Sequence, residues 1–376
     1  MFKLLALFAA ALVLAYISEQ NTKSAIAAGK RYSVWNDWAY LLLVFVLVLF
    51  AGLRTGYNDT WNYIMGFKNC PEFSDWIADP KNFNPFMNPL FCGYQSFLKS
   101  WTHNPNLLIF TTAAFSQISL ICFIKRYSKN FTFSIFIFFT LGTFVFSLAA
   151  IKQIVAMAIL TFAFPYLEKK KWVPYFAIVL IAMLVHTYAV AFLFIPLFRI
   201  KPWRLFTFVF IAVVAVVMIH FEEAITAFMD QANDLGKTLA EFEVFSDTTI
   251  NIFRLAVYTV PPLISLVFQR WVLHDTDDME NTLIHMSIIS LAFMAMGTQA
   301  GANMFGRMGN YFELGTICYL PTMLKKTFDV RSYRFVSVVA CVCFMGFFVY
   351  ANALHGNFDV EYQSIGIFEF FEGLVG

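Results

Sequence analysis

The sequence predicts an all-α polytopic integral membrane protein with about 12 transmembrane helices, and three observations support this fold class. Hydrophobic residues make up 60% of the 376 positions and charged residues only 13%, whereas about a quarter of a soluble globular domain is charged. Apolar segments close to the length that a bilayer-spanning helix needs follow one another along most of the chain. Basic residues also gather in alternate loops, as they do in multi-pass proteins.

The predicted helices follow from these apolar segments in order. We expect spans near residues 2–17, 34–53, 105–124, 131–149, 153–167, 172–186, 188–199, 204–221, 251–270, 282–298, 304–324 and 333–352. The two spans around His186 have alternatives, because 172–199 could instead form one long helix, or two short helices that meet within the membrane. The first segment also has an alternative reading as a signal peptide, because Lys3 is followed by an apolar stretch with small residues. Cleavage of such a peptide would reverse the side of every later loop.

The loops between these spans predict an orientation. Alternate loops hold most of the 26 basic residues, and the opposite face holds most of the acids. Because Lys and Arg are enriched in cytoplasmic loops, both termini then lie outside. We therefore expect one transmembrane domain over 1–376 with outer loops at 54–104 and 222–250 and an outer amphipathic tail at 353–376. Two cysteines of the first outer loop, Cys70 and Cys92, could pair if that face is oxidising.

Four cations do not fit the basic-residue distribution. Arg54 ends the second span, Lys152 with Gln153 opens the fifth, Arg254 opens the ninth and Arg307 lies within the eleventh. A charge in an apolar segment costs several kcal/mol unless it faces protein or water. A single such residue can extend to the lipid headgroups, but four at one depth are better explained by a shared anionic ligand. Arginine binds phosphate through a planar fork of donors, so the cluster suits a diphosphate.

Two residues are candidates for proton transfer beside these cations. His186 lies near the outer end of its span and could act as a base, contact a phosphate or link helices. Asp59 follows Arg54 by five residues and could pair with it, orient it or accept a proton from a substrate hydroxyl. His103 and Glu313 are weaker candidates for the same roles.

Several familiar site types are absent from the sequence. It contains no P-loop, zinc motif, nucleophile elbow or dinucleotide fingerprint. We therefore expect a metal-independent reaction with no cofactor and no nucleic-acid partner. Acidic residues of the first outer loop, Asp59 among them, leave a metal-dependent alternative open.

Four motifs together resemble the EpsG-like branch of the Wzy-type polysaccharide polymerases. In chain order these are LRTGYNDTWNYIMGF, KQIVAMAIL, AMLVHTYAV and RMGNYFELGTICYLP, spread between about residue 40 and residue 325. The family's first motif falls on Arg54, Gly56, Asp59 and Tyr63, with Gly56 one residue early. The second motif usually has Arg-Gln, and here Lys152 with Gln153 keeps the charge without the bidentate fork.

The resemblance implies a glycosyltransferase of GT-C-like architecture in the bacterial inner membrane. Such a polymerase joins oligosaccharide repeat units carried on undecaprenyl diphosphate at the periplasmic face, so donor and acceptor are both lipid-linked. It implies His186 or Asp59 as the catalytic base. The substrate-binding residues that it implies, several of them diphosphate contacts, are Arg54, Tyr63, Lys152, Gln153, Arg254, Arg307 and Tyr311.

The product implied is O-antigen, capsule or exopolysaccharide, with membrane lipid, a chain-length regulator and a flippase as further partners. Two other functions stay open: a flippase for the same lipid-linked sugar, and a membrane acyltransferase that modifies the polymer. The absence of an internal repeat disfavours the flippase, because transporters commonly contain such repeats. The outer position of His186 disfavours the acyltransferase, which would need its histidine to meet an acyl donor from the cytoplasm.

Overall fold

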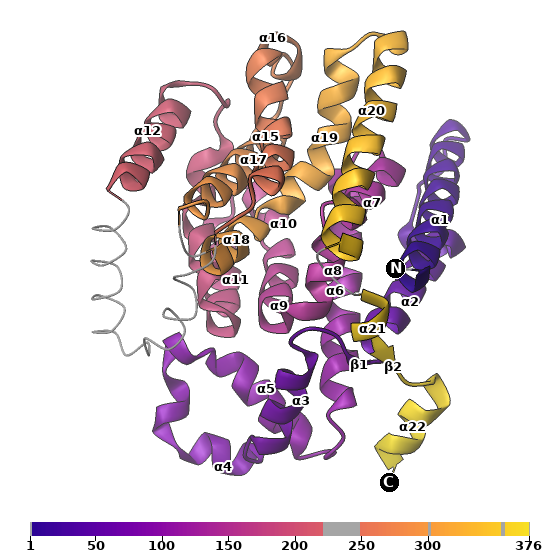
Figure 1. The fold of residues 1–376 in the computed structure, drawn as a ribbon, viewed down its shortest axis with the longest axis vertical. Helices are drawn as coiled ribbons and strands as arrows, with labels where there is room; N and C mark the ends of the chain where they lie inside the picture. The colour runs from indigo at the N-terminus through magenta and orange to yellow at the C-terminus, as the bar shows by residue number, and fades with distance from the viewer. Residues whose placement is uncertain (1, 221–248, 300–301, 355–357, 376) are drawn as a thin grey trace. The chain divides into compact units, whose positions relative to one another are not determined.

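The computed structural model describes residues 2–220, 249–299, 302–354 and 358–375 (Figure 1). The predicted outer segment 222–250 lies almost wholly outside these residues. The chain divides into two compact units, each described by itself. The first contains Met1–Tyr166, Lys171–Ala189 and Phe344–Gly376, and the second contains Leu167–Lys170 and Val190–Cys343.

The first unit is built from apolar helices joined by short turns, and capping residues mark several helix starts. The helices are α1 (Phe2–Ala27), α2 (Trp38–Gly52), α3 (Thr60–Asn69), α4 (Phe73–Ala78), α5 (Pro89–Lys99), α6 (Asn106–Tyr127), α7 (Phe131–Thr140), α8 (Thr143–Ala149), α9 (Ile151–Thr161), α11 (Trp172–Val185), α21 (Phe358–Glu361) and α22 (Ile367–Val375), with the short turns η1 (Val34–Asn36), η2 (Pro80–Phe83) and η3 (Pro85–Met87). Asp37 accepts the N–H groups of Ala39 and Tyr40 and so begins α2. Cys70 and Cys92 are both free thiols.

The second unit is organised around α17, which packs on α15, α18 and α19. Its helices are α12 (Leu205–Ile219), α15 (Ile252–Val267), α16 (Gln269–Val272), α17 (Asp278–Met296), α18 (Ala302–Asn310) and α19 (Glu313–Thr327). Gly315 lies where α19 meets α17, since a Cβ on it would lie 2.4 Å from the carbonyl oxygen of Leu283. Three elements cross the boundary between the units: α10 (Phe164–Glu168), η4 (Thr187–Arg199) and α20 (Val330–Val349), which η5 (Tyr350–Leu354) continues.

The helices confirm an all-α membrane fold. Among the described residues, five helices are long and apolar enough to cross a bilayer, or six if α7 and α8 count as one bent span. Five further apolar helices of 10–17 residues include α2, α12 and α15. At 1.5 Å per residue, the 15 residues of α2 reach about 22 Å, less than the roughly 30 Å of the hydrocarbon core. The number of twelve spans therefore stays a prediction.

Breaks interrupt several of the predicted apolar segments. The segment 131–149 bends by 52° between α7 and α8, where Gly142 takes a φ of +96° that a side chain would disfavour. The segment 304–324 is two helices, α18 and α19, separated by Tyr311 and Phe312. At His186 the backbone is extended, with φ −154° and ψ 116°, and it ends α11 before η4 begins. Of the two alternatives for 172–199, the structure therefore has two short helices.

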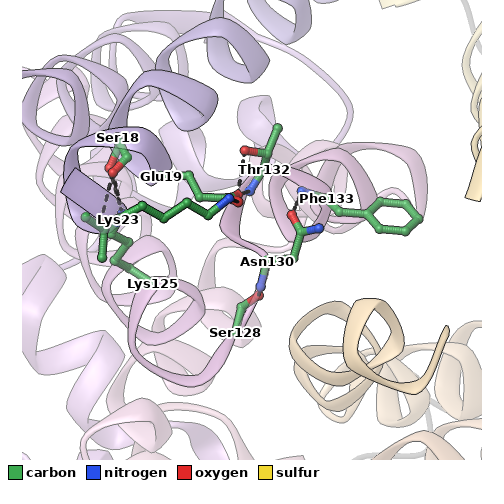
Figure 2. Close-up of polar contacts among 9 residues, drawn as sticks. Ser18, Glu19, Lys23, Lys125, Ser128, Asn130, Thr132 and Phe133 are labelled. Atoms are coloured by element: carbon green, nitrogen blue, oxygen red, sulfur yellow. Dashed lines mark hydrogen bonds and ion pairs between the residues drawn. The ribbon is translucent and has the colours of Figure 1, made fainter. Parts of the chain in front are cut away.

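The end of α1 is held to α6 and α7 by partly buried polar contacts (Figure 2). Lys125 Nζ donates to Ser18 Oγ at 2.7 Å. The Glu19 carboxylate accepts the hydroxyl of Thr132 at 2.8 Å and pairs with Lys23 one turn away. Such i,i+4 pairs stabilise a helix, and α1 accordingly continues ten residues beyond its predicted end, to Ala27.

The C-terminal tail contacts the end of α2 through a short two-stranded sheet. Strand β1 (Arg54–Gly56) pairs antiparallel with β2 (Gln363–Ser364), with Arg54 opposite Ser364. Just before β2, the Tyr362 hydroxyl donates to the carbonyl of Phe50 at 2.6 Å, and the two rings stack at 4.4 Å. The tail therefore covers the segment that carries the first predicted site residue.

Candidate functional site

Arg54 is an interior residue of the first unit. Its side chain is 1% exposed, and it donates to the carbonyl oxygen of Ala51 and, at 3.3 Å, to the hydroxyl of Thr60. Burial lowers the pKa of Arg54 to about 10, against the opposing effect of nearby Tyr362 and Tyr63. The guanidinium therefore stays charged at neutral pH and joins the end of α2 to the start of α3.

Helix α3 brings Tyr63 to the start of α9. The backbone N–H of Lys152 donates to the Tyr63 hydroxyl at 3.4 Å. The ammonium group of Lys152 lies 5.6 Å from the centre of the Phe91 ring, a cation–π distance. Gln153, the next residue, is buried. Lys152, the first residue of the second motif, thus lies beside Tyr63 of the first.

Asp59 lines an open groove of about 850 Å³ in the first unit. The groove is polar with aromatic walls, and α3, the start of α6 and the tail supply its surface. It is lined by Thr55, Gly56, Tyr57, Asn58, Asp59, Trp61, Ile64, Lys68, Pro105, Asn106, Glu361 and Gln363. An exposed indole such as that of Trp61 (61% exposed) offers a flat apolar surface with a polar edge.

His186 is half-buried where α11 ends. Its ring lies edge-on to that of Tyr188, with centroids 5.0 Å apart. The neighbouring residue Val185 lines an apolar hollow of about 290 Å³ that also includes Phe91 and Val155. The hollow is thus lined by the residue that precedes His186 and by the ring over which Lys152 lies, whereas His186 and Lys152 are not among its lining residues.

Arg254 and the helix that carries Arg307 meet in the second unit. Arg254 Nη2 donates to Asn310 Oδ1 at 3.0 Å. Its Nη1 lies 4.0 Å from the position that a Cβ would occupy on Gly306. Arg254 therefore reaches α18 beside Arg307, and any side chain at Gly306 would narrow this approach.

A buried tyrosine contacts Arg254 and is itself hydrogen-bonded to a buried carboxylate. The Arg254 guanidinium lies 5.6 Å from the centre of the Tyr258 ring, one turn further along α15. The Tyr258 hydroxyl donates to the carboxylate of Glu313. Tyr258 and Glu313 are 4% and 2% exposed, so this hydrogen bond is shielded from water. Glu313, a weaker proton-transfer candidate in the sequence, here orients the tyrosine.

Tyr311 is also interior, and its ring lies 6.1 Å from that of Phe192. It belongs to the short connection between α18 and α19, directly after Asn310. Arg307 is half-buried on α18. Sequence reasoning missed Tyr258 and Asn310. The only signal for Tyr258 was its spacing of four residues from Arg254, which places both on one helix face.

The predicted residues thus form two groups, one in each unit. The first unit contains Arg54, Asp59, Tyr63, Lys152, Gln153 and His186, and the second contains Arg254, Arg307 and Tyr311. Whether the four cations share one ligand stays a prediction, since each unit is described by itself. No three His, Cys, Asp or Glu side chains lie together in the described parts of the chain.

Comparison with known proteins gives one match. The model of the EpsG family matches residues 37–364, a range that contains every predicted site residue. No curated protein and no solved structure matches the chain.

Proposed function

The chain belongs to the EpsG family, which indicates a polysaccharide polymerase, and on this premise we propose which reaction it performs. It joins oligosaccharide repeat units carried on undecaprenyl diphosphate, at the periplasmic face of the bacterial inner membrane. The observation that carries this proposal is the contact of Arg254 with Asn310 on α18, the helix that also carries Arg307.

The bond changes define what the protein must supply. An acceptor hydroxyl oxygen attacks the anomeric carbon of the donor glycan, and the bond from that carbon to the diphosphate breaks. The lipid diphosphate leaves with the bonding electrons, and the hydroxyl proton passes to a base. Negative charge therefore grows on the leaving group, where fixed cations stabilise the transition state more than the ground state.

Arg254 and Arg307 are the proposed diphosphate contacts in the second unit. The cation–π contact with Tyr258 and the hydrogen bond to Asn310 fix the direction of Arg254 before substrate arrives. A preorganised guanidinium needs little reorganisation when charge develops. Arg54, Lys152, Gln153, Tyr63 and Tyr311 remain proposed substrate contacts on the basis of the motifs.

Two residues of the first unit are proposed for the proton. Asp59 lines the polar groove, where a sugar hydroxyl could reach it. His186 directly follows Val185, which lines the apolar hollow. This hollow is of a kind to accept part of the carrier's polyprenyl chain, because its lining is mostly apolar. This arrangement favours Asp59 as the base and His186 as a neighbour of the lipid.

Removal of single guanidinium groups tests the proposal. Arg254→Gln and Arg307→Gln should each lower polymer formation by roughly 10²- to 10³-fold, which is typical for the loss of one preorganised donor. Arg331→Gln is the matched control, since Arg331 is an exposed arginine of the same unit at the start of α20. The readout is the ladder of chain lengths formed by purified protein from lipid-linked units, with membrane insertion checked for each variant.

The same assay distinguishes a polymerase from a flippase. Elongation by the purified wild-type protein, in detergent and without any second compartment, supports glycosyl transfer, whereas a flippase would leave the units unjoined. An unchanged ladder from Arg254→Gln and Arg307→Gln would reject their assigned role. Full activity in His186→Gln with loss in Asp59→Asn would place the base at Asp59, and the reverse pattern would place it at His186.

A further inference from the structure

A second hollow, of about 560 Å³, lies in the second unit where α12 begins and α15 ends. Its polar groups are mainly cations, and no acidic side chain lines it. The lining residues are Lys201, Pro202, Arg204, Val267, Gln269, Arg270, Trp271, Leu273 and His274. The basic-residue distribution places these loops on the face opposite the proposed catalytic groups, the predicted cytoplasmic side.

Three of these cations have no partner within the described parts of the chain. The side chains of Lys201, Arg204 and Arg270 are exposed and make no hydrogen bond or ion pair there. The nearest acids in the sequence are already engaged. Asp275 contacts His274 at 2.5 Å, and Asp278 pairs with the buried Arg199 at 2.6 Å.

Asp277, between those two acids, caps α17 by accepting the N–H of Glu280 at 2.7 Å. The surrounding acids are therefore committed to other groups, and the hollow keeps an excess of positive charge. An anion from outside this unit would neutralise it.

The loop that carries two of these cations is firmly held. Pro202 and Trp203 are buried between the exposed Lys201 and Arg204. Trp203 takes a left-handed φ of 58°, unusual for a bulky residue. Its indole N–H donates to Ser265 Oγ at 3.0 Å, which ties the loop to α15. The backbone is thus held in a conformation that leaves Lys201 and Arg204 exposed on either side of the buried pair Pro202 and Trp203.

Apolar surface begins directly beside the charges. Leu205, the first residue of α12, is 80% exposed, and Val267 and Trp271 at the other wall are 58% and 57% exposed. Helix α12 packs on α17 through Thr207, whose hydroxyl lies 3.0 Å from His285 Nε2, and Thr207 is its only buried residue. The hollow therefore combines cationic lining residues with exposed apolar side chains of α12 and of the end of α15.

We infer that this hollow binds the phosphate of an anionic phospholipid, with Lys201, Arg204 and Arg270 around the headgroup and an acyl chain along α12. Inorganic phosphate shares the anionic chemistry but has nothing to place on Leu205 or Val267. Basic pockets at the cytoplasmic ends of transmembrane helices commonly hold anionic headgroups, and an exposed tryptophan such as Trp271 is typical of the same depth. The site is independent of the proposed polymerase reaction.

The test compares lipid retention by the full-length protein in native mass spectrometry. The probes are dioleoyl phosphatidylglycerol and, as the neutral comparator, dioleoyl phosphatidylcholine. The double variant Arg204→Gln with Arg270→Gln should retain phosphatidylglycerol about 25-fold less than wild type, since each cation near the membrane surface contributes roughly fivefold. Both side chains are exposed, so folding should be preserved. The matched control is Arg331→Gln with Arg334→Gln, which removes two exposed charges of the same unit outside the hollow.

Selective loss of phosphatidylglycerol in the first double variant alone supports the inference. Equal loss in both double variants would overturn it in favour of diffuse surface charge, and equal retention of the two lipids by wild type would overturn it as well. Displacement of phosphatidylglycerol by an excess of inorganic phosphate would reject the lipid and assign the hollow to a free anion.

Discussion

The hydrogen bond between Tyr258 and Glu313 should be measurable as a coupling energy, because both side chains are buried and the acceptor is a carboxylate. Interhelical hydrogen bonds in membrane proteins contribute about 0.6 kcal/mol on average. Bonds to an ionised group are roughly twice as strong as neutral ones. We therefore expect a coupling of about 1.2 kcal/mol between α15 and α19.

A double-mutant cycle of Tyr258→Phe and Glu313→Gln isolates this value. Tyr258→Phe alone should cost about 1–3 kcal/mol, because it leaves the buried carboxylate without its donor. The assay is the free energy of unfolding of the purified protein in a detergent titration. As a control, Tyr258→Phe with Asp329→Asn should be additive, since Asp329 lies at the start of α20 and contacts Ser332. A coupling below about 0.5 kcal/mol in the first cycle would refute the orienting role of Glu313.

Two further predictions concern packing and the tail. Gly315→Ala should destabilise the second unit by at least about 2 kcal/mol, because the new Cβ would meet the Leu283 carbonyl oxygen at 2.4 Å. Gly346→Ala, which has nothing within 4 Å, should be neutral or stabilising in the same unfolding assay; equal effects would contradict the close helix contact. Burial raises the pKa of the Tyr362 hydroxyl from 10.0 to about 12. The protonated hydroxyl therefore stabilises the folded state fully below pH 10, and this stabilisation is lost as pH rises through 12. Wild-type stability should therefore fall more steeply over that range than that of Tyr362→Phe, and parallel curves would contradict the tail contact.

The helical fold could be predicted because apolar composition and segment length are local properties. The tail contact could not. Strands of three and two residues are too short to show periodicity, and the hydrogen bond from Tyr362 to Phe50 joins residues 312 positions apart. The sequence does not decide whether the helix breaks at His186, because an apolar sequence without Gly or Pro at that point is compatible with a continuous helix. Only packing decides where the helix ends.

The candidate site shows where local patterns stop being informative. Sequence identifies an arginine near a helix end, but the partner of that arginine comes from elsewhere in the fold. Arg54 turns inward onto Ala51 and Thr60, Arg254 lies on Tyr258 and Asn310, and Arg204 faces solvent without a partner among the described residues.

These three environments should differ in how strongly they bind an anion. A guanidinium whose donors are engaged by the protein must release them, or use those that remain, before it contacts a ligand. Arg54 therefore has fewer donors left for its proposed substrate contact, because it also joins Ala51 at the end of α2 to Thr60 at the start of α3. Arg254 keeps further donors while its orientation is fixed by an aromatic face, which is the combination that a developing diphosphate charge requires. We therefore expect Arg254 to stabilise the leaving diphosphate more strongly than the buried Arg54 does.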